Sequence, residues 1–129
     1  MIVDTSAIIA ILYREADGPD FYHRLISAPQ KAIGATTVVE LGIQLDKVSN
    51  QAERDLLQQR FDQIGLSVLP ITPEIALLAR EAHRRYGRYS GSPARLNFGD
   101  CFAYALAKSR GEPLLFKGED FAHTDVRRA

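Results

Sequence analysis

The sequence predicts an α/β fold in which a parallel sheet is flanked by helices. Short apolar segments of strand length alternate with longer segments in which apolar residues recur at helical spacing. This alternation is typical of parallel sheets, because two parallel strands need a long crossover that a helix usually supplies. The length of 129 residues suits one domain, residues 1–129, and no repeat, linker or low-complexity tract divides it.

The first half of the chain supplies two predicted strands and four predicted helices. Thr5 or Ser6 is expected to cap the first helix, and Asn50 with Glu53 forms a capping-box pattern at the start of the fourth. The strands are predicted at Met1–Asp4 and Ala32–Ala35, and the helices at Ala7–Leu12, at Asp17–Ser27, from Thr36 or Thr37 to about Val48, and from Asn50 to about Gly65.

The second half supplies the remaining strands, two helices and a loop. Thr72 and Pro73 mark the start of the fifth helix, because proline is favoured at the first helical position. The segment Gly87–Asn97 is rich in Gly, Ser, Pro and Arg and is predicted to be a mobile loop. The strands are predicted at Leu66–Ile71 and Pro113–Phe116, the helices at Pro73 to about Tyr86 and at Phe98–Ser109, a turn at Gly118–Phe121 and a final short strand at Val126.

Two acidic residues stand in surroundings that are otherwise apolar. Asp4 ends the first strand, where a buried strand presents its last residue at the carboxyl edge of the sheet. Asp100 is the only charge across nearly three turns of a helix predicted to be buried, and a buried carboxylate needs a cation or hydrogen bonds. Simpler roles are open to both, because Asp4 suits a helix N-cap and Asp100 suits a first turn.

Glu40 and the pair Glu119–Asp120 repeat this placement. Glu40 is a single charge in an apolar stretch at a helix start, although Thr37 as N-cap would put it at the capping-box position. Glu119 and Asp120 follow the last long strand in a turn, where acids are usually solvated. Strand ends and helix starts share one edge of a parallel sheet, so the acids are expected to meet. Converging carboxylates raise each other's pKa unless a cation binds, and oxygen ligands suit Mg²⁺ or Mn²⁺.

Four segments, in this order, resemble the PIN-domain ribonucleases, most closely the VapC-type toxins of bacterial toxin–antitoxin pairs. They are Ile2-Val-Asp-Thr-Ser, Thr37-Val-Val-Glu-Leu, Asn97-Phe-Gly-Asp-Cys-Phe-Ala-Tyr-Ala-Leu-Ala, and Leu114-Leu-Phe-Lys-Gly-Glu-Asp-Phe with Thr124-Asp125. The resemblance covers essentially the whole chain. It implies a three-layer α/β/α sandwich on a mostly parallel sheet and Mg²⁺-dependent cleavage of RNA, often a structured RNA such as transfer RNA. It further implies a homodimer and a cognate antitoxin whose tail covers the acidic cleft.

The resemblance also assigns metal-site roles to the acids. They carry over onto Asp4, Glu40 and Asp100, with Mn²⁺ as a substitute for Mg²⁺. The fourth acid is either Asp120, by its position before a phenylalanine, or Glu119, by its distance from the strand. The expected reaction is in-line attack of a metal-activated water on a phosphodiester, with Asp4 and Asp100 holding the ion.

Two further residues, Thr5 and Asn97, resemble supporting positions in the same family. Such positions hydrogen-bond the acids or the water that the metal holds. Ser6 is not predicted to act as a nucleophile, because no base is recognisable near it in the sequence.

Attraction to RNA must come from a local patch, because sixteen basic residues balance sixteen acidic ones. A cluster of arginines adjoins the predicted loop, with Tyr86 and Tyr89 available to stack on bases. The alternative is an ordinary solvated helix face. The candidate RNA-binding residues are Arg80, Arg84, Arg85, Arg88 and Arg95.

The composition predicts a cytoplasmic protein that does not span a membrane. Cys101 is the only cysteine, so no intrachain disulfide forms, which fits a reducing compartment. No apolar run reaches the roughly 18 residues that a membrane span needs. The segment Met1–Glu15 lacks the basic start of a signal peptide and is interrupted by Asp4, so it is expected to be folded structure.

Two alternatives to the nuclease compete with it. The first is an inactive PIN-like module that only binds RNA or a protein. The full set of acids argues against it, because a pure binder does not need to bring like charges together. The second is a haloacid-dehalogenase-type phosphatase, which also has an aspartate after its first strand. That family expects a second aspartate where Ser6 stands, so it ranks lower.

Overall fold

Four short parallel strands form the central sheet of this computed structural model, which describes residues 1–129. The order across the sheet is β3-β2-β1-β4, so β1 lies between two neighbours. Ile2 of β1 is paired with Ala32 of β2 on one side and with Leu114 of β4 on the other. The strands are β1 (Ile2–Val3), β2 (Ala32–Gly34), β3 (Ser67–Leu69) and β4 (Leu114–Leu115).

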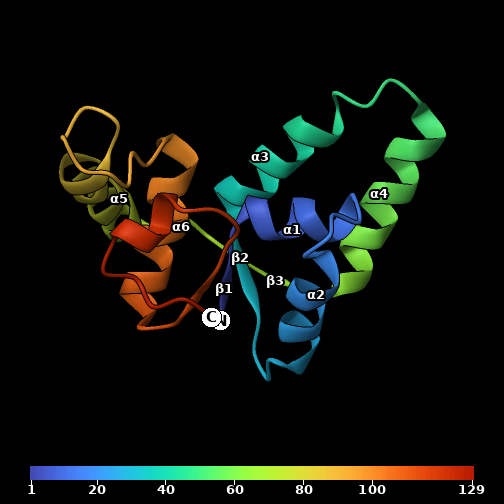
Figure 1. Cartoon of the computed structure of the whole chain (residues 1–129), viewed down its shortest axis with the longest axis horizontal. Coiled ribbons are helices and arrows are strands. Elements are labelled where there is room, and N and C mark those ends of the chain that lie inside the picture. The colour runs from blue at the N-terminus through green and yellow to red at the C-terminus, as the bar shows by residue number, and fades with distance from the viewer.

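Six helices cover the two faces of the sheet. One face is covered by α1 (Thr5–Leu12), α2 (Gly18–Ser27), α3 (Ala35–Leu45) and α4 (Gln51–Ile64), and the other by α5 (Pro73–Tyr86) and α6 (Phe98–Arg110). Figure 1 shows the two groups on opposite sides of the strands. No helix here has the length and apolar character that a bilayer span requires. The three-layer α/β/α sandwich predicted from the sequence is confirmed.

The alternation of side chains along β1 explains the two hydrophobic cores. Successive residues of a strand point to opposite faces of the sheet. Ile2 accordingly packs with α5 and α6, whereas Val3 packs with α1, α2, α3 and α4. Both residues have no exposed surface, so β1 is buried on both faces and ends directly at Asp4.

Two helices begin differently from the sequence prediction. Asp4, rather than Thr5 or Ser6, caps α1, which confirms the N-cap role considered for Asp4 as an alternative, and its Oδ2 accepts a hydrogen bond from the backbone N–H of Ser6 at 3.0 Å. Helix α3 follows β2 without a loop, with Gly34 at its N-cap position and no side-chain cap. The capping box considered for Glu40 with Thr37 is therefore wrong. The side chain of Glu40 has another partner, described below.

Helix α3 ends at Leu45 rather than near Val48, and the remaining predicted helix ends lie within one residue of those observed. Asn50 caps α4 and Thr72 caps α5, each through a side-chain oxygen that accepts a backbone N–H. Helices α4 and α6 end at Gly65 and Gly111, which have positive φ angles of 69° and 62°. Glycine adopts this conformation without the steric cost that a side chain brings.

The C-terminal segment departs from the prediction. The turn expected at residues 118–121 continues into a 3₁₀ helix, η1 (Asp120–His123). Val126 packs against the core of α5 and α6 but forms no strand. The contact with the sheet comes instead from Arg128, which makes an isolated parallel bridge with Leu114.

The loop between α5 and α6 is anchored at both ends. Gly87 forms an isolated bridge with Leu96, and Ala94 and Leu96 are fully buried. A side chain on Gly87 would collide with the backbone of His83, so this close approach requires glycine. The mobility predicted for the loop stays a prediction for its tip, residues 88–93.

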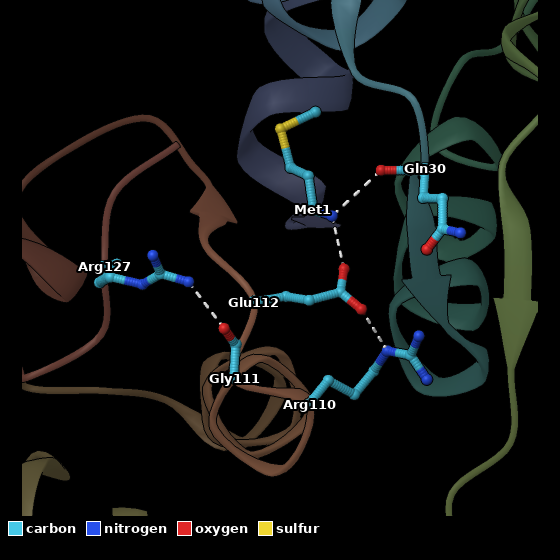
Figure 2. A network of polar contacts seen from close by, with 6 residues as sticks. All are labelled: Met1, Gln30, Arg110, Gly111, Glu112 and Arg127. Carbon is cyan, nitrogen blue, oxygen red and sulfur yellow. Dashed lines mark hydrogen bonds and ion pairs between the residues drawn. The ribbon is translucent and has the colours of Figure 1, made fainter.

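The amino-terminal end of the sheet carries a network of paired charges (Figure 2). The amino group of Met1 contacts a carboxylate oxygen of Glu112 at 2.5 Å and the carbonyl oxygen of Gln30 at 3.1 Å. The guanidinium of Arg110 donates to the other carboxylate oxygen of Glu112 at 2.6 Å. These contacts lower the pKa of Glu112, chiefly through the hydrogen bond from the amino group.

Candidate active site

The opposite, carboxyl end of the sheet opens into a pocket of about 640 Å³. The pocket lies where β1 meets α1, beside the second half of α3, and where α6 and η1 begin. These elements start or end at one edge because all strands are parallel. Four of the five acids singled out in the sequence line it, namely Asp4, Glu40, Asp100 and Asp120.

Asp4 is held by the first turn of α1. Its Oδ2 accepts the hydroxyl of Ser6 at 2.5 Å and the backbone N–H of the same residue at 3.0 Å. Burial raises the pKa of Asp4, the hydrogen bonds from Ser6 oppose that rise, and the nearby charge of Glu40 adds to it. Asp4 is thus both the helix cap and a wall of the pocket.

Glu40 reaches the pocket from the second turn of α3. Its Oε2 accepts a hydrogen bond from the hydroxyl of Thr5 at 2.8 Å, and its Oε1 accepts none. The carboxylate lies against the backbone at the start of α6, where a Cβ on Gly99 would stand 2.6 Å from Oε2. A Cβ there would displace the carboxylate, so glycine at position 99 allows Glu40 to lie at the positive end of the helix dipole. Gly99 was not predicted as a site residue.

Asp100 is fixed by a reciprocal capping box at the start of α6. Its Oδ2 accepts the backbone N–H of Asn97 at 2.7 Å, and its own N–H donates to Oδ1 of Asn97 at 3.0 Å. Oδ1 of Asp100 accepts no hydrogen bond. The helix is buried around Asp100, as predicted, but Phe98 at its first position is 77% exposed.

The effect of the negative charges in the pocket is clearest in the pKa of Asp100. Its pKa is raised from 3.8 to about 6, chiefly by burial. The negative charges of Asp4, Asp120 and Glu40 raise it further, against the hydrogen bond from Asn97, which lowers it. Like charges that raise a pKa in this way favour either a proton or a cation among them.

The two candidates for the fourth acid lie differently. Asp120, the first residue of η1, lines the pocket and contributes to the raised pKa of Asp100. Glu119 is exposed and does not line the pocket. The geometry therefore favours Asp120 as the acid that joins the other three.

Ser6 and Lys117 line the pocket without having been predicted there. The backbone N–H of Lys117 donates to Oγ of Ser6 at 3.0 Å. The hydroxyl proton of Ser6 is then directed to Asp4, so Ser6 links the segment after β4 to the carboxylate that follows β1. The signal for Lys117 was its place directly after the last long strand, the same placement that drew attention to Glu119 and Asp120.

The ammonium of Lys117 is already paired. It contacts Asp17 at 2.8 Å and also Glu15, and its pKa is raised by these two carboxylates, Asp17 first. It therefore does not neutralise the four acids. The acidic half of the pocket keeps its excess of negative charge.

None of the five predicted RNA-binding arginines lines the acidic pocket. All are exposed, on the outer face of α5 and in the loop after it. Arg84 forms an exposed ion pair within α5, and the guanidinium of Arg85 lies 4.9 Å from the ring centre of Tyr86. Tyr86 itself packs on Tyr104, with ring centres 5.6 Å apart, whereas Tyr89 is 94% exposed. Tyr89, not Tyr86, is the aromatic side chain free to stack.

The donor set of the pocket suits some metal ions better than others. No three His, Cys, Asp or Glu side chains lie close enough together to hold a metal ion directly. The acidic side chains of the pocket offer only oxygen atoms as metal ligands. Asp100 and Glu40 each keep one carboxylate oxygen without a hydrogen bond. Mg²⁺ usually binds through one or two carboxylates and keeps several waters, so this arrangement fits Mg²⁺ better than an ion that needs a closed cage.

Comparison with known proteins identifies the family. The chain matches the PIN domain over residues 1–127. It is 47% identical over 129 residues to the VapC ribonuclease Mb0625 of Mycobacterium bovis, covering 100% of this chain and 97% of the relative. Ribonuclease VapC42 of Mycobacterium tuberculosis is 43% identical over 129 residues, with 100% and 98% covered. The chain belongs to the PIN-domain family and, within it, to the VapC ribonucleases, which are enzymes that cleave RNA.

Solved structures of lower identity share the fold. The FitAcB structure from Neisseria gonorrhoeae has a TM-score of 0.75 and 21% identity, covering 98% of this chain and 94% of that one. VapC20 of Mycobacterium tuberculosis, described as a sarcin-ricin loop cleaving toxin, has a TM-score of 0.76 and 15% identity, with 99% and 97% covered. At these identities the likeness shows the fold alone. The family assignment excludes the dehalogenase-type phosphatase.

Proposed function

We propose that this chain is the Mg²⁺-dependent endoribonuclease toxin of a toxin–antitoxin pair and hydrolyses phosphodiester bonds in RNA. The observation that supports this most is the meeting of Asp4, Glu40, Asp100 and Asp120 in one pocket at the carboxyl edge of the sheet. The raised pKa of Asp100 supports a need for positive charge there. The relatives named VapC ribonucleases support the choice of RNA as substrate.

The four acids have different roles in holding the cation. Asp4 and Asp100 are the direct ligands in this proposal, and Glu40 and Asp120 act through water. When bound, Mg²⁺, or Mn²⁺ in its place, acts as a Lewis acid that lowers the pKa of water and offsets charge on the phosphoryl oxygens. Thr5 and Asn97 keep the carboxylates of Glu40 and Asp100 in place through the hydrogen bonds described above.

RNA is attracted by surfaces outside the acidic pocket. Without a cation the pocket repels phosphate, so affinity needs basic groups elsewhere. The exposed arginines Arg80, Arg84, Arg85, Arg88 and Arg95, with Tyr89, are the surface proposed for this role. Replacing Arg84 and Arg85 together by Glu should weaken RNA binding and flatten its salt dependence by about 0.7 in slope for each phosphate that is no longer neutralised. An unchanged slope contradicts this surface.

Other molecules complete the proposal. The toxin–antitoxin complex from Klebsiella pneumoniae, with a TM-score of 0.70 and 19% identity, supports a cognate antitoxin as partner. A homodimer, a cytoplasmic location and a structured RNA target such as transfer RNA belong to the same proposal. Co-expression with the product of the neighbouring reading frame, followed by co-purification, tests the antitoxin.

The central experiment measures cleavage of RNA by the purified chain with Mg²⁺, with EDTA, and after Asp4→Asn. Asparagine also caps helices well, so this variant keeps α1 while removing the charge. Cleavage should require Mg²⁺ and should be lost in the variant. Undiminished cleavage by a folded Asp4→Asn protein contradicts the site. RNA binding without cleavage by the wild-type chain would point to the inactive binding module.

A further inference from the structure

The pocket continues beyond the four acids as a groove between α1 and α3. Both helices start at the carboxyl edge of the sheet and run outward to the same side of the molecule (Figure 1). One wall is formed by Thr5 and Ile9 of α1 and by Tyr13, the residue that follows α1, at helical spacing. The facing wall carries Glu40, Gln44, Lys47 and Val48, from α3 and the residues just after it.

The chemistry of the groove changes along its length. Tyr13 directly follows α1, about 12 Å from Thr5 at 1.5 Å per residue, and Lys47 lies in the turn just after α3, which carries Glu40 in its second turn. The inner half is therefore acidic. The outer half holds an aromatic ring, an amide and an ammonium, with the partly buried side chains of Ile9 and Val48 beside them.

The volume exceeds what a hydrated ion needs. A water molecule takes up about 30 Å³ in the liquid, so a cation with six waters fills roughly 200 Å³. The pocket measures about 640 Å³, which lies within the range of small-ligand sites. The pocket therefore has room for a ligand larger than a hydrated cation.

Two side chains in the outer half of the groove, Lys47 and Tyr13, are free to bind a ligand. The ammonium of Lys47 donates only to Oε1 of Gln44, at 2.8 Å, and forms no ion pair. This distinguishes it from Lys117, the other cation of the groove, which contacts two carboxylates. The phenol of Tyr13 makes no hydrogen bond, and the residue is 42% exposed. A cation without an ion pair and an exposed ring in one groove are the features that bind single-stranded nucleic acid.

We propose that the outer half of this groove is a subsite for one nucleotide of a single-stranded RNA segment next to the scissile phosphate. Lys47 binds a phosphate, the ring of Tyr13 stacks on the base, and Gln44 faces the edge of that base. The subsite rests on the proposed ribonuclease function. It adds to that function a cation that holds the strand where the four acids alone repel it.

The test measures the affinity of a fluorescein-labelled single-stranded hexaribonucleotide by anisotropy at several salt concentrations. The parent is the full chain with Asp4→Asn and Asp100→Asn, which lowers repulsion and prevents cleavage. Tyr13→Ala should weaken binding about 5- to 100-fold, the range seen when a stacking aromatic is removed. Tyr13→Phe keeps the ring and should stay within about twofold of the parent. Lys47→Gln should reduce the salt slope by about 0.7.

Matched controls come from residues outside the groove. Tyr22→Ala removes a tyrosine of similar exposure, 47%, from the surface of α2. Lys31→Gln removes a lysine without an ion pair from the opposite edge of the sheet, just before β2. Both should leave affinity and salt slope unchanged. If Tyr13→Ala does not fold, Lys47→Gln tests the subsite by itself. Lys47 is exposed, so its replacement should not disturb the fold.

The outcomes separate the subsite from the function on which it rests. If the wild-type chain cleaves RNA with Mg²⁺ but Tyr13→Ala and Lys47→Gln bind like the controls, the subsite is overturned and the ribonuclease stands. If the wild-type chain neither binds nor cleaves RNA, both proposals fall. If these variants lose affinity for the antitoxin but not for RNA, the groove is a protein-docking surface and the RNA subsite is overturned.

Discussion

Carboxylates at the two ends of the sheet have pKa values shifted in opposite directions. At the amino-terminal end, Glu112 lies between the amino group of Met1 and the guanidinium of Arg110, and its pKa is lowered (Figure 2). At the carboxyl end, burial and neighbouring acids raise the pKa of Asp4 and Asp100. The first arrangement is complete without a ligand. The second is balanced only by a proton or an added cation.

This difference shows that charges that stabilise the fold and charges that form the candidate site lie at opposite ends of the sheet. Charge pairs at the amino-terminal end tie together segments distant in sequence. At the carboxyl end the protein supplies hydrogen bonds that position the acids but no cation that neutralises them, since Lys117 pairs elsewhere. Removing a charge should therefore have opposite consequences at the two ends.

Asp100→Asn should lower RNA cleavage by about 1,000-fold, because loss of a metal ligand forfeits several kcal/mol of transition-state stabilisation. Asparagine can still accept the N–H of Asn97, so α6 keeps its cap. Cleavage rates with saturating Mg²⁺ are the measurement, and circular dichroism confirms the fold. A folded variant with wild-type rates contradicts the assignment.

The pH dependence of stability should reveal Asp100 when divalent cations are removed with EDTA. The folded-state pKa of about 6 lies above the ordinary 3.8, so the folded protein keeps a proton that the unfolded chain releases between these values. Stability from this group is full below about pH 4 and is lost as pH rises through about 6. The loss is at most about 3 kcal/mol. Urea unfolding of wild type and Asp100→Asn should show a gap that widens with pH; parallel curves contradict the raised pKa.

Mg²⁺ should stabilise the wild-type protein near neutral pH. A ligand at 100 times its Kd adds about 2.7 kcal/mol, and EDTA should reverse the gain. Thermal melting over an Mg²⁺ titration measures it, with Mn²⁺ as a second ion. Glu112→Gln should respond as the wild type does, and Asp100→Asn should respond weakly. An equal response in all three proteins places the ion elsewhere.

Glu112→Gln should lower the free energy of unfolding by about 1 kcal/mol and leave RNA cleavage unchanged. Its side chain is 20% exposed, so solvent screens the ion pairs and keeps the effect small. Because its pKa is lowered, this stability is present above the ordinary pKa of 4.5 and is lost as pH falls. Urea unfolding at pH 7 and pH 4 measures it. If Glu112→Gln loses RNA cleavage while its free energy of unfolding is unchanged, Glu112 serves activity rather than stability, and the contrast between the two ends is wrong.

Much of the fold followed from local patterns. Apolar segments of strand length and capping residues such as Asn50 and Thr72 predicted the elements and their order, because each pattern acts within a few residues. Predictions failed where distant contacts decide. Glu40 appeared to suit a capping box, but Thr5 from another helix holds its carboxylate. Val126 resembled a strand residue, but Arg128 makes the contact with the sheet.

The sequence alone determined which residue types stand at strand ends and helix starts, and so it predicted an acidic edge. It could not determine which oxygens remain free, because that depends on side chains brought together from far along the chain. Tertiary structure alone decided that Asp120 rather than Glu119 faces the pocket and that Lys117 is already paired. It alone joined Tyr13 and Lys47 in one groove, because each follows a helix and these two helices, α1 and α3, pack against each other.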